Sequence, residues 1–415
     1  MDIKIRKKYL FYVLAFGSAV VAAITSGLDT AISNIYIEDS WAFGVAAFLI
    51  GILVALILAL FLSIKVKGES LGGRFIDPSF DRLRLIDKNE LKYHLIAGVG
   101  NAVLTAGYFA LLSDLGDPSV VLPFTQIVIL YLVVFESAIG KGFPTLSEVQ
   151  SAVIVTFGAI LGSLTLTGSI GLEPLVIVFL VINPAWVVFS IYQRKLKLMK
   201  FKNKYNDSIN IRFWNVVFSC LFTIIFVFFI DMLFGSNHLI AGLTASIVHF
   251  KWIFLSMFLT FFSYVFYIRA LGIGKASVTQ AVRASVIIFA IPVTLFLAHV
   301  GISPAFPFDS TLLVIKFIGT TLILLGIASY ALTLVKGYVF IKSKPGYPIE
   351  ETMDKLWKIR GVNRVTATAG PYDFIVKIHV RTLVKGYERV IKNLEKIQGI
   401  DSYKWESVLK EWEDI

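Results

Sequence analysis

The sequence has few of the residues on which metal, redox and hydrolytic chemistry depend. Its 415 residues include one cysteine, Cys220, and five histidines that lie far apart, without the spacing of metal ligands. A single cysteine leaves no disulfide framework and no cysteine-based metal site. No Gly-x-x-x-x-Gly-Lys-Ser/Thr phosphate loop is present, so nothing indicates ATP hydrolysis of that kind. We expect neither enzymatic activity nor a cofactor.

Charged residues are also scarce, at 16% of the chain, whereas hydrophobic residues make up 57% and the mean hydropathy is +0.78. A water-soluble domain could not cover that much apolar surface, which indicates a polytopic α-helical membrane protein. About ten apolar stretches, each long enough to cross ~30 Å of hydrocarbon, precede Lys336. We place these spans near residues 9–29, 41–64, 93–113, 118–139, 149–168, 173–193, 211–234, 250–271, 276–299 and 311–335.

The basic residues, which give a net charge of +11, concentrate in alternate loops. They gather at the N-terminus, in residues 65–92 and 194–204, and from Lys336 onward; Lys251 and Lys316 are exceptions. This alternation follows the positive-inside rule, so it predicts a multi-pass protein of the cell membrane with both termini in the cytoplasm. It explains the basic charge without a nucleic-acid partner. The first apolar run could be a secretory signal, but its removal would leave an odd number of spans, so we interpret it as a retained helix.

A short pattern recurs about 160 residues apart in the apolar region. Ala110-Leu111, Gly116 and Ser119-Val120 correspond to Ala270-Leu271, Gly274 and Ser277-Val278. With five spans in each half, residues 8–168 and 173–335 would lie in opposite orientations in the bilayer. Inverted repeats are typical of transporters. Chance similarity between two apolar hairpins is the alternative.

Residues 336–415 have the pattern of a separate, small soluble domain after a membrane domain of residues 1–335. Helical spacing over 349–359 and 383–397 alternates with four strand candidates near 338–342, 364–369, 374–380 and 401–409. Gly361 and Gly399 occupy equivalent turns after the two helices, as glycines that end helices do. Two strand–helix–strand units predict an α+β ferredoxin-like βαββαβ fold.

The membrane part resembles the EamA-type branch of the drug/metabolite transporter superfamily. The resemblance rests on the run from Arg269 to Val278, on Arg283-Ala284-Ser285 and on the spacing of Gly319 and Gly326. It implies an all-α body of ten transmembrane helices in two inverted five-helix repeats. Glu136 lies slightly before the place of the family's Gly-Glu pair, and the second half has no acidic residue there, which puts a family role for Glu136 in doubt.

The tail resembles the effector-binding domain, or RAM domain, of leucine-responsive/AsnC regulators. The resembling residues are Gly361-Val362, the hairpin Thr368-Ala369-Gly370-Pro371-Tyr372-Asp373, and Gly399-Ile400. The resemblance implies a homodimer formed through the sheets and a small effector, often an amino acid, bound near the hairpin. Its candidate residues are Thr368, Gly370, Tyr372 and Asp373. Alternatively, Asp373 only fixes the turn. The helix-turn-helix of those regulators is missing.

Arg283 is the sharpest feature of the membrane part, because it lies about two helical turns into its span. A charge at that depth normally faces protein or water. It could be the counter-charge of an anionic or zwitterionic solute, or it could reach back to the membrane surface. Gln280 and Ser285 lie close to it in sequence and favour a polar cavity.

Further candidates for the solute pathway are polar or aromatic residues at the pseudo-symmetric or central positions of other spans: Thr125, Gln126, Asn101, Asn183, Trp186 and Tyr264. Hydrogen bonding between helices and interfacial aromatic belts are the alternatives. Gly158 and Gly162 indicate a close helix contact. Asp29 and Glu136 are the acidic candidates for a proton site.

Our main hypothesis is a secondary transporter of small organic solutes, expected to be amino acids or related metabolites, regulated by a tail that binds an effector and dimerises. The alternative is a membrane-anchored metabolite sensor or scaffold that does not transport. Arg283 and the lack of mid-membrane carboxylates argue against a third reading, a cation channel or magnesium-type carrier. A polar cavity between the two halves would favour transport, and a sealed apolar core would favour the sensor.

Overall fold

The computed structural model describes residues 7–115, 125–139, 146–162, 176–201, 204–301, 310–332, 334–359, 361–381 and 386–407. The chain forms two compact units, of which one comprises Met1–Lys141 with Ala152–Leu325 and the other Gly142–Ser151 with Gly326–Ile415. We call the first the helical unit and the second, which contains a four-stranded sheet, the tail unit.

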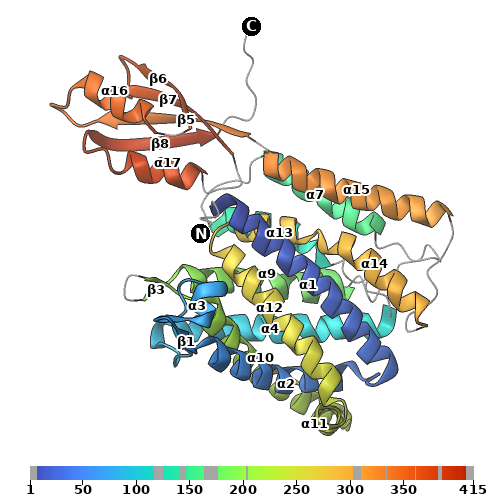
Figure 1. The fold of residues 1–415 in the computed structure, drawn as a ribbon. Helices are drawn as coiled ribbons and strands as arrows, with labels where there is room; N and C mark the ends of the chain where they lie inside the picture. Colours follow the sequence, from blue (N-terminus) through green and yellow to red (C-terminus); the bar gives the residue numbers. More distant parts are fainter. Residues whose placement is uncertain are drawn as a thin grey trace. The chain divides into compact units, whose positions relative to one another are not determined.

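Helices dominate the chain up to residue 332 (Figure 1). In chain order they are α1 (Lys7–Ile35), α2 (Ser40–Leu62), α3 (Leu71–Phe75), α4 (Lys88–Leu115), α6 (Val128–Ile139), α7 (Leu146–Gly162), η1 (Ile177–Ile182), α9 (Asn183–Leu198), α10 (Ser208–Phe234), α11 (His238–Val248), α12 (Phe250–Leu271), α13 (Ala276–Arg283), α14 (Val286–His299) and α15 (Ser310–Leu332). Two short hairpins, β1–β2 (Lys65–Val66, Glu69–Ser70) and β3–β4 (Lys200–Phe201, Lys204–Tyr205), lie between helices.

Within the described residues, seven segments are long and apolar enough to cross a membrane. They are Tyr9–Ile35, Ser40–Leu62, Lys88–Leu111, Ile177–Leu198, Ser208–Phe234, Phe250–Leu271 and Ala276–His299. Each matches a predicted span. The predicted spans 118–139, 149–168 and 311–335 lie partly outside the described residues, and their described parts contribute to α6, α7 and α15.

Besides the five-residue α3, the sequence prediction lacked one longer helix. Residues 238–248 were taken as part of an outer loop, but they form α11, which packs on α2. Gly242 allows the approach, because a Cβ there would come within 2.8 Å of the Ala42 carbonyl oxygen. At 1.5 Å per residue, eleven residues cannot cross a bilayer, so α11 adds no span.

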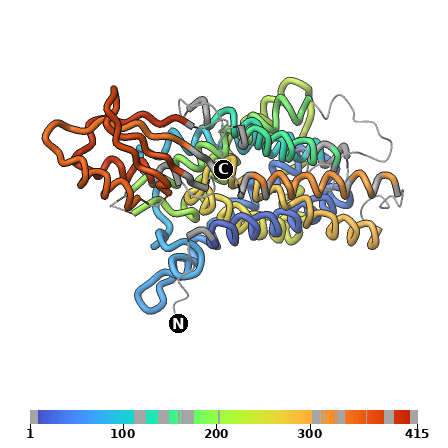
Figure 2. Tube along the Cα trace, turned by 90° about the horizontal axis from the view of Figure 1, so that it is seen from above, coloured from blue at the N-terminus to red at the C-terminus, as the bar shows by residue number. Residues whose placement is uncertain are grey.

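Small residues set the distances between the long helices. In both views α1 runs beside α12 and α14 (Figure 1 and Figure 2). The Ser263 hydroxyl on α12 donates to the Ser18 carbonyl oxygen on α1 at 3.0 Å. Between α7 and α15, a Cβ at Gly158 would lie 2.6 Å from the Gly319 carbonyl oxygen, so the predicted close contact at Gly158 is confirmed.

Short turns lie at corresponding positions of the two halves. A turn at Ala284-Ser285 separates α13 from α14, and a turn at Gln126-Ile127 precedes α6. Both turns use i→i−3 backbone bonds. When Ser119-Val120 is aligned with Ser277-Val278, Gln126-Ile127 falls on Ala284-Ser285. Interrupted helices of this kind are tolerated in membranes where they line a cavity.

A third irregularity precedes Pro184. The six residues of η1 form a π-helix that leads directly into α9. Proline cannot donate the backbone bond that a regular helix needs at this point, and local π-helical widening accommodates the gap. Trp186 therefore follows a distortion near the middle of its span.

The two long loops predicted to be cytoplasmic are joined by a buried ion pair, and a second, partly exposed ion pair lies within the first loop. Lys197 Nζ lies 2.6 Å from Asp77 Oδ2, which also accepts the Ser208 amide and hydroxyl, each at 2.8 Å. Arg84 makes a two-pronged ion pair with Glu90, with both nitrogen–oxygen distances 2.7 Å. Burial alone would raise the pKa of Asp77, but Lys197 and the hydrogen bonds hold this pKa below its ordinary value. The loops are therefore a folded structure and more than solvated surface.

The tail unit has a four-stranded antiparallel sheet in the order β6-β7-β5-β8, formed by β5 (Leu334–Ser343), β6 (Val362–Ala367), β7 (Phe374–Arg381) and β8 (Ile400–Ser407). Helices α16 (Ile349–Trp357) and α17 (Gly386–Leu394) complete the predicted βαββαβ order. The buried core includes Val339, Ile341, Phe374, Val376 and Leu356.

The predicted glycine after the first tail helix needs a correction in position. Helix α16 ends at Trp357, with Lys358 as its C-cap, so Gly361 is not the residue directly after the cap. Gly361 nevertheless has φ +106°, a conformation that favours glycine, and it leads into β6. The end of α16 and the left-handed residue Gly361 are therefore separated by one further turn of the chain.

Candidate functional site

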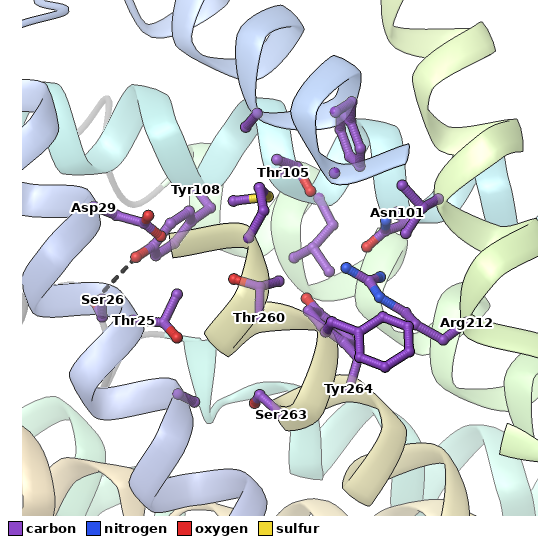
Figure 3. Close-up of a pocket in the computed structure, with 18 of the residues that line it drawn as sticks. Thr25, Ser26, Asp29, Asn101, Thr105, Tyr108, Arg212, Thr260, Ser263 and Tyr264 are labelled. Atoms are coloured by element: carbon purple, nitrogen blue, oxygen red, sulfur yellow. Dashed lines mark hydrogen bonds between the residues drawn. The ribbon is translucent and has the colours of Figure 1, made fainter. Parts of the chain in front are cut away.

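A cavity of about 120 Å³ lies within the helical unit (Figure 3). Its lining side chains come from α1, α2 and α4 of the first half, from α9, α10, α12 and α13 of the second half, and from Thr125 just before α6. A cavity needs roughly 10–15 Å³ to hold one water molecule. The space is therefore large enough for several waters or a small solute, and both halves of the chain contribute to it.

Arg283, the last residue of α13, lines this cavity beside the interruption of its helix. Its side chain is 5% exposed, so it is buried among other side chains of the helical unit. Nε donates to the Ser18 hydroxyl at 3.2 Å. The guanidinium lies 5.2 Å from the ring centroids of both Trp186 and Tyr267, within the range of cation–π attraction.

Arg212 on α10 is a second arginine in the same wall, and it is 4% exposed. Its guanidinium lies 4.3 Å from the centroid of the Tyr264 ring, and that of Arg283 lies 5.9 Å from the same centroid. One terminal nitrogen of Arg212 contacts Asn215 Oδ1 at 3.4 Å. Within the described residues neither arginine has an ion pair, so two arginines adjoin one cavity without a directly paired carboxylate.

Several polar atoms on the cavity wall have no protein partner within the described residues. They include Arg212 Nε, Asn101 Oδ1 and Thr260 Oγ1, and these three are buried. A buried polar group without a partner costs about 1–3 kcal/mol. Three such groups around one cavity indicate that water or a polar solute completes their hydrogen bonds.

An acidic residue, Asp29 on α1, lines the same cavity and is 4% exposed. It accepts a hydrogen bond from the Ser256 hydroxyl, and the Tyr108 hydroxyl also interacts with it. Tyr108 in turn donates to Ser26 at 3.0 Å (Figure 3). In Figure 3, Asp29 and Arg212 lie on opposite sides of the group of lining side chains, with Thr260 between them.

The predicted pathway residues divide into two groups. Arg283, Thr125, Asn101, Trp186 and Tyr264 line the cavity, whereas Gln280, Gln126, Ser285 and Asn183 do not. Gln280 Nε2 donates to Gln126 Oε1 and Gln126 Nε2 to Thr125 Oγ1, both at 2.9 Å, so this chain of bonds joins the two halves beside the cavity. Asn183 is fully buried, and neither of its amide atoms is bonded within the described residues.

Sequence reasoning missed Arg212. It lies five residues into a helix that follows a basic loop, where an arginine is indistinguishable from the charges that set membrane topology. A usable signal was the chain of polar residues Arg212, Asn215 and Ser219, because their spacing puts them on one helix face.

Glu136 has a structural partner that the sequence did not suggest. Its carboxylate accepts the Ala276 amide at 2.8 Å and the Ser277 hydroxyl at 2.6 Å, at the start of α13. Arg194 lies 3.8 Å away. A carboxylate at a helix N-terminus is favourable, so Glu136 stabilises the contact between α6 and α13 outside the cavity.

The predicted effector residues of the tail lie together at the hairpin between β6 and β7. Asp373 Oδ2 accepts the Ser343 amide at 2.6 Å and its hydroxyl at 2.7 Å, and these bonds lower the pKa of Asp373. Thr368 donates its hydroxyl to the Tyr372 carbonyl oxygen. Asp373 thus ties the hairpin to β5, as the turn-fixing alternative expected. Gly370 has open space beside its Cα.

Comparisons with known proteins identify the tail. Residues 336–414 match the family model of the Lrp/AsnC ligand binding domain. The HTH-type transcriptional regulator LysM of Sulfurisphaera tokodaii is 30% identical over 78 residues, which are 19% of this chain and 55% of that protein. The chain thus spans about half the length of this curated relative. A solved crystal structure, described only as that of a protein, aligns with 77% of this chain and 96% of its own at 14% identity, with a TM-score of 0.47.

Proposed function

We propose that this chain, whose residues 336–414 carry an Lrp/AsnC ligand-binding domain, is a secondary transporter of small organic solutes with a carboxylate group. Amino acids and related metabolites are the expected substrates. The observation that carries the proposal is the cavity in which Arg212 and Arg283 are buried without an ion pair among the described residues. Buried charges in membrane helices are costly, and they normally mark a solute or ion pathway.

The surrounding helices support transport. The cavity is lined by both halves; a turn at Ala284-Ser285 interrupts the helix of the second half, and a turn at Gln126-Ile127 lies at the corresponding position of the first. Exchange between outward-open and inward-open states in transporters is a movement of one repeat against the other around a central site of discontinuous helices. The Gln126–Gln280 bond and the Glu136 contact with α13 join the halves. We expect them to change during that exchange.

The tail supports regulation by a metabolite. A ligand-binding module of the Lrp/AsnC type suggests that the tail senses an amino acid and pairs with a second copy. In our proposal, effector binding in the cytoplasm reports the size of a metabolite pool and adjusts transport accordingly. The two activities need no shared residue, because each belongs to its own compact unit.

The alternative is a membrane-anchored metabolite sensor that does not transport. The tail domain favours this alternative, because a ligand-binding domain could detect a metabolite without any transport by the helical unit. The alternative does not explain the charged residues of the cavity, because a sensor needs no buried arginines without ion pairs in its membrane anchor. The two arginines also argue against a cation channel, since they would repel the permeant ion.

The test is solute counterflow in proteoliposomes that contain the purified full-length chain. We expect uptake of at least one carboxylate-bearing metabolite, and we expect Arg212→Ala to reduce it more than tenfold without loss of the folded protein. Arg74→Ala is the matched control, because Arg74 is exposed and outside the cavity. Absence of counterflow for amino acids, 2-oxo acids and other organic acids alike would leave the sensor as the better account.

A further inference from the structure

The proposed solute site has a negative as well as a positive end. The charged residues that line the cavity are Arg212, Arg283 and Asp29. Both guanidinium groups lie within 6 Å of the Tyr264 ring centroid. Asp29 instead interacts with Ser256 and Tyr108. Figure 3 shows Asp29 and Arg212 at opposite edges of the lining side chains.

Asp29 is a buried carboxyl group on the cavity wall that has no ion pair among the described residues. A buried carboxylate is stable when it is paired with a cation or when it binds a proton. Within the described residues the neighbours of Asp29 are hydroxyl groups. Hydroxyl donors satisfy part of the carboxylate without neutralising its charge.

The wall between the two ends is neutral and carries hydroxyl groups among mostly apolar side chains. Thr25, Ser26, Thr260 and Ser263 contribute hydroxyl groups from α1 and α12 (Figure 3). No other acidic or basic side chain is among the lining residues that the structure describes. A solute that neutralises both ends must therefore carry a cationic group and an anionic group on one small skeleton.

We propose that Asp29 binds the ammonium group of the solute, so that the cavity selects α-amino acids over the matching 2-oxo acids and amines. The carboxylate of the amino acid is bound by Arg212 and Arg283, and its ammonium donates to Asp29. This inference rests on the proposed transport function and adds the chemical class of the substrate. It concerns the membrane cavity and is independent of the effector site in the tail.

Matched solute pairs test the ammonium site. Counterflow of labelled L-leucine and L-glutamate is compared with that of 4-methyl-2-oxopentanoate and 2-oxoglutarate, which have the same skeletons without the ammonium. Wild-type protein should favour the amino acid of at least one pair by more than tenfold. Asp29→Asn should remove most of that preference through a loss of amino-acid transport, while 2-oxo acid transport stays within about threefold of the wild type.

Two controls separate the ammonium role from other roles of Asp29. Asp39→Asn changes a carboxylate that caps α2 outside the cavity, and it should leave the preference unchanged. Ser256→Ala removes the hydroxyl that bonds Asp29 but keeps the charge, so the preference should persist. Both variants and Asp29→Asn are first compared by thermal unfolding and size-exclusion chromatography.

The possible failures are distinguishable. If wild-type protein transports amino acids and 2-oxo acids equally, the ammonium site is wrong and the proposed transport function stands. If Asp29→Asn abolishes both classes equally while the protein remains folded, Asp29 acts on the transport cycle, as a proton site would, and the inference is overturned. If no solute is transported, the proposed function fails, and this inference fails with it.

Discussion

Arginine is costly to bury, and the helical unit buries two arginines beside one cavity. Aromatic rings stabilise both guanidinium groups, but an aromatic face does not provide a full negative charge. The side chains are held in place by packing and by Ser18 and Asn215 while their charge remains available. This combination is what a site for a carboxylate requires.

Arg283 is predicted to be essential for transport. Arg283→Ala should abolish counterflow and leave folding and tail dimerisation intact. Arg283→Lys should restore part of the activity, because lysine retains the charge but not the planar guanidinium. Counterflow of the preferred solute is the measurement, with Arg74→Ala as the control. Wild-type counterflow rates in Arg283→Ala would show that the side chain has no part in the pathway.

The buried pair of Asp77 and Lys197 is predicted to contribute strongly to stability. Asp77→Asn should lower the free energy of unfolding by about 3 kcal/mol, because it leaves Lys197 buried without its counter-charge. Asp81→Asn is the control: its pair with Lys65 is exposed, so its removal should change the free energy by less than about 1 kcal/mol. Thermal unfolding at pH 7, followed by tryptophan fluorescence, measures both.

The stabilisation by Asp77 should also depend on pH. The pKa of Asp77 is lower in the folded protein than its ordinary value. The contribution of the pair is therefore fully present above the unfolded-state pKa of about 3.9 and is lost as the pH falls through the folded-state pKa. The stability difference between wild type and Asp77→Asn should shrink only in that acidic range. A constant difference down to pH 2 would contradict the assignment.

At the scale of elements, the turn between α13 and α14 determines where Arg283 lies on the cavity wall. Continuous spans would place Arg283 on a rigid helix face, whereas the turn at Ala284-Ser285 ends α13 at this residue, on the cavity wall. The start of α13 is held by Glu136 of α6. A short helix fixed at one end and interrupted at the other can move as a unit.

Glu136 is predicted to hold the start of α13 against α6. Glu136→Gln should weaken this cap by about 1 kcal/mol and raise amide hydrogen exchange at residues 276–279 roughly fivefold. Exchange measured by mass spectrometry on the full-length protein gives the answer. Glu69→Gln is the control, because Glu69 is exposed in the β1–β2 hairpin. Equal exchange in Glu136→Gln and wild type would show that the cap does not hold α13.

At the scale of the whole molecule, the orientation in the membrane remains a prediction from the loop charges. In a Cys220→Ser background, Glu38→Cys and Lys67→Cys place single thiols at exposed residues of opposite predicted sides. An impermeant maleimide added to intact cells should label Glu38→Cys at least tenfold more than Lys67→Cys. Cell lysis should make both sites reactive. The reverse labelling pattern would invert the topology.

The tail is predicted to dimerise through the sheet face away from its helices. Tyr338, Phe340 and Ile375 are only partly buried on that face, and covering such side chains favours pairing with a second copy. Residues 336–415 alone should sediment as a dimer or larger, and at least one amino acid should raise their melting temperature.

Asp373→Ala distinguishes the two readings of the tail hairpin. If Asp373 binds the effector, the variant should lose the ligand-dependent rise in melting temperature but still dimerise. If Asp373 only joins the hairpin to Ser343, the variant should lower the melting temperature and keep the ligand-dependent rise. A monomeric, ligand-indifferent wild-type tail would contradict both the dimer and the regulatory role.

Local sequence patterns were sufficient to predict the long apolar helices and the order of the tail elements. The bounds Phe250–Leu271 and Ala276–His299 agree with the predicted spans, because the length of an apolar run and its charged flanks are properties of neighbouring residues. The same holds for the βαββαβ order of the tail, where period-two and helical spacing alternate along the chain. Helix α11 was missed because its apolar run is too short to be read as a span.

Only the tertiary structure decided which polar residues meet. The amino-acid sequence by itself predicted a helical part with membrane-spanning segments and a small α+β tail, since composition and periodicity indicate burial and secondary structure. Asp29, Arg212 and Arg283 are separated by large stretches of chain, and each alone resembles an interfacial or topological charge. They line one cavity because α1, α10 and α13 pack around it, and that packing depends on the shapes of many small contacts at once.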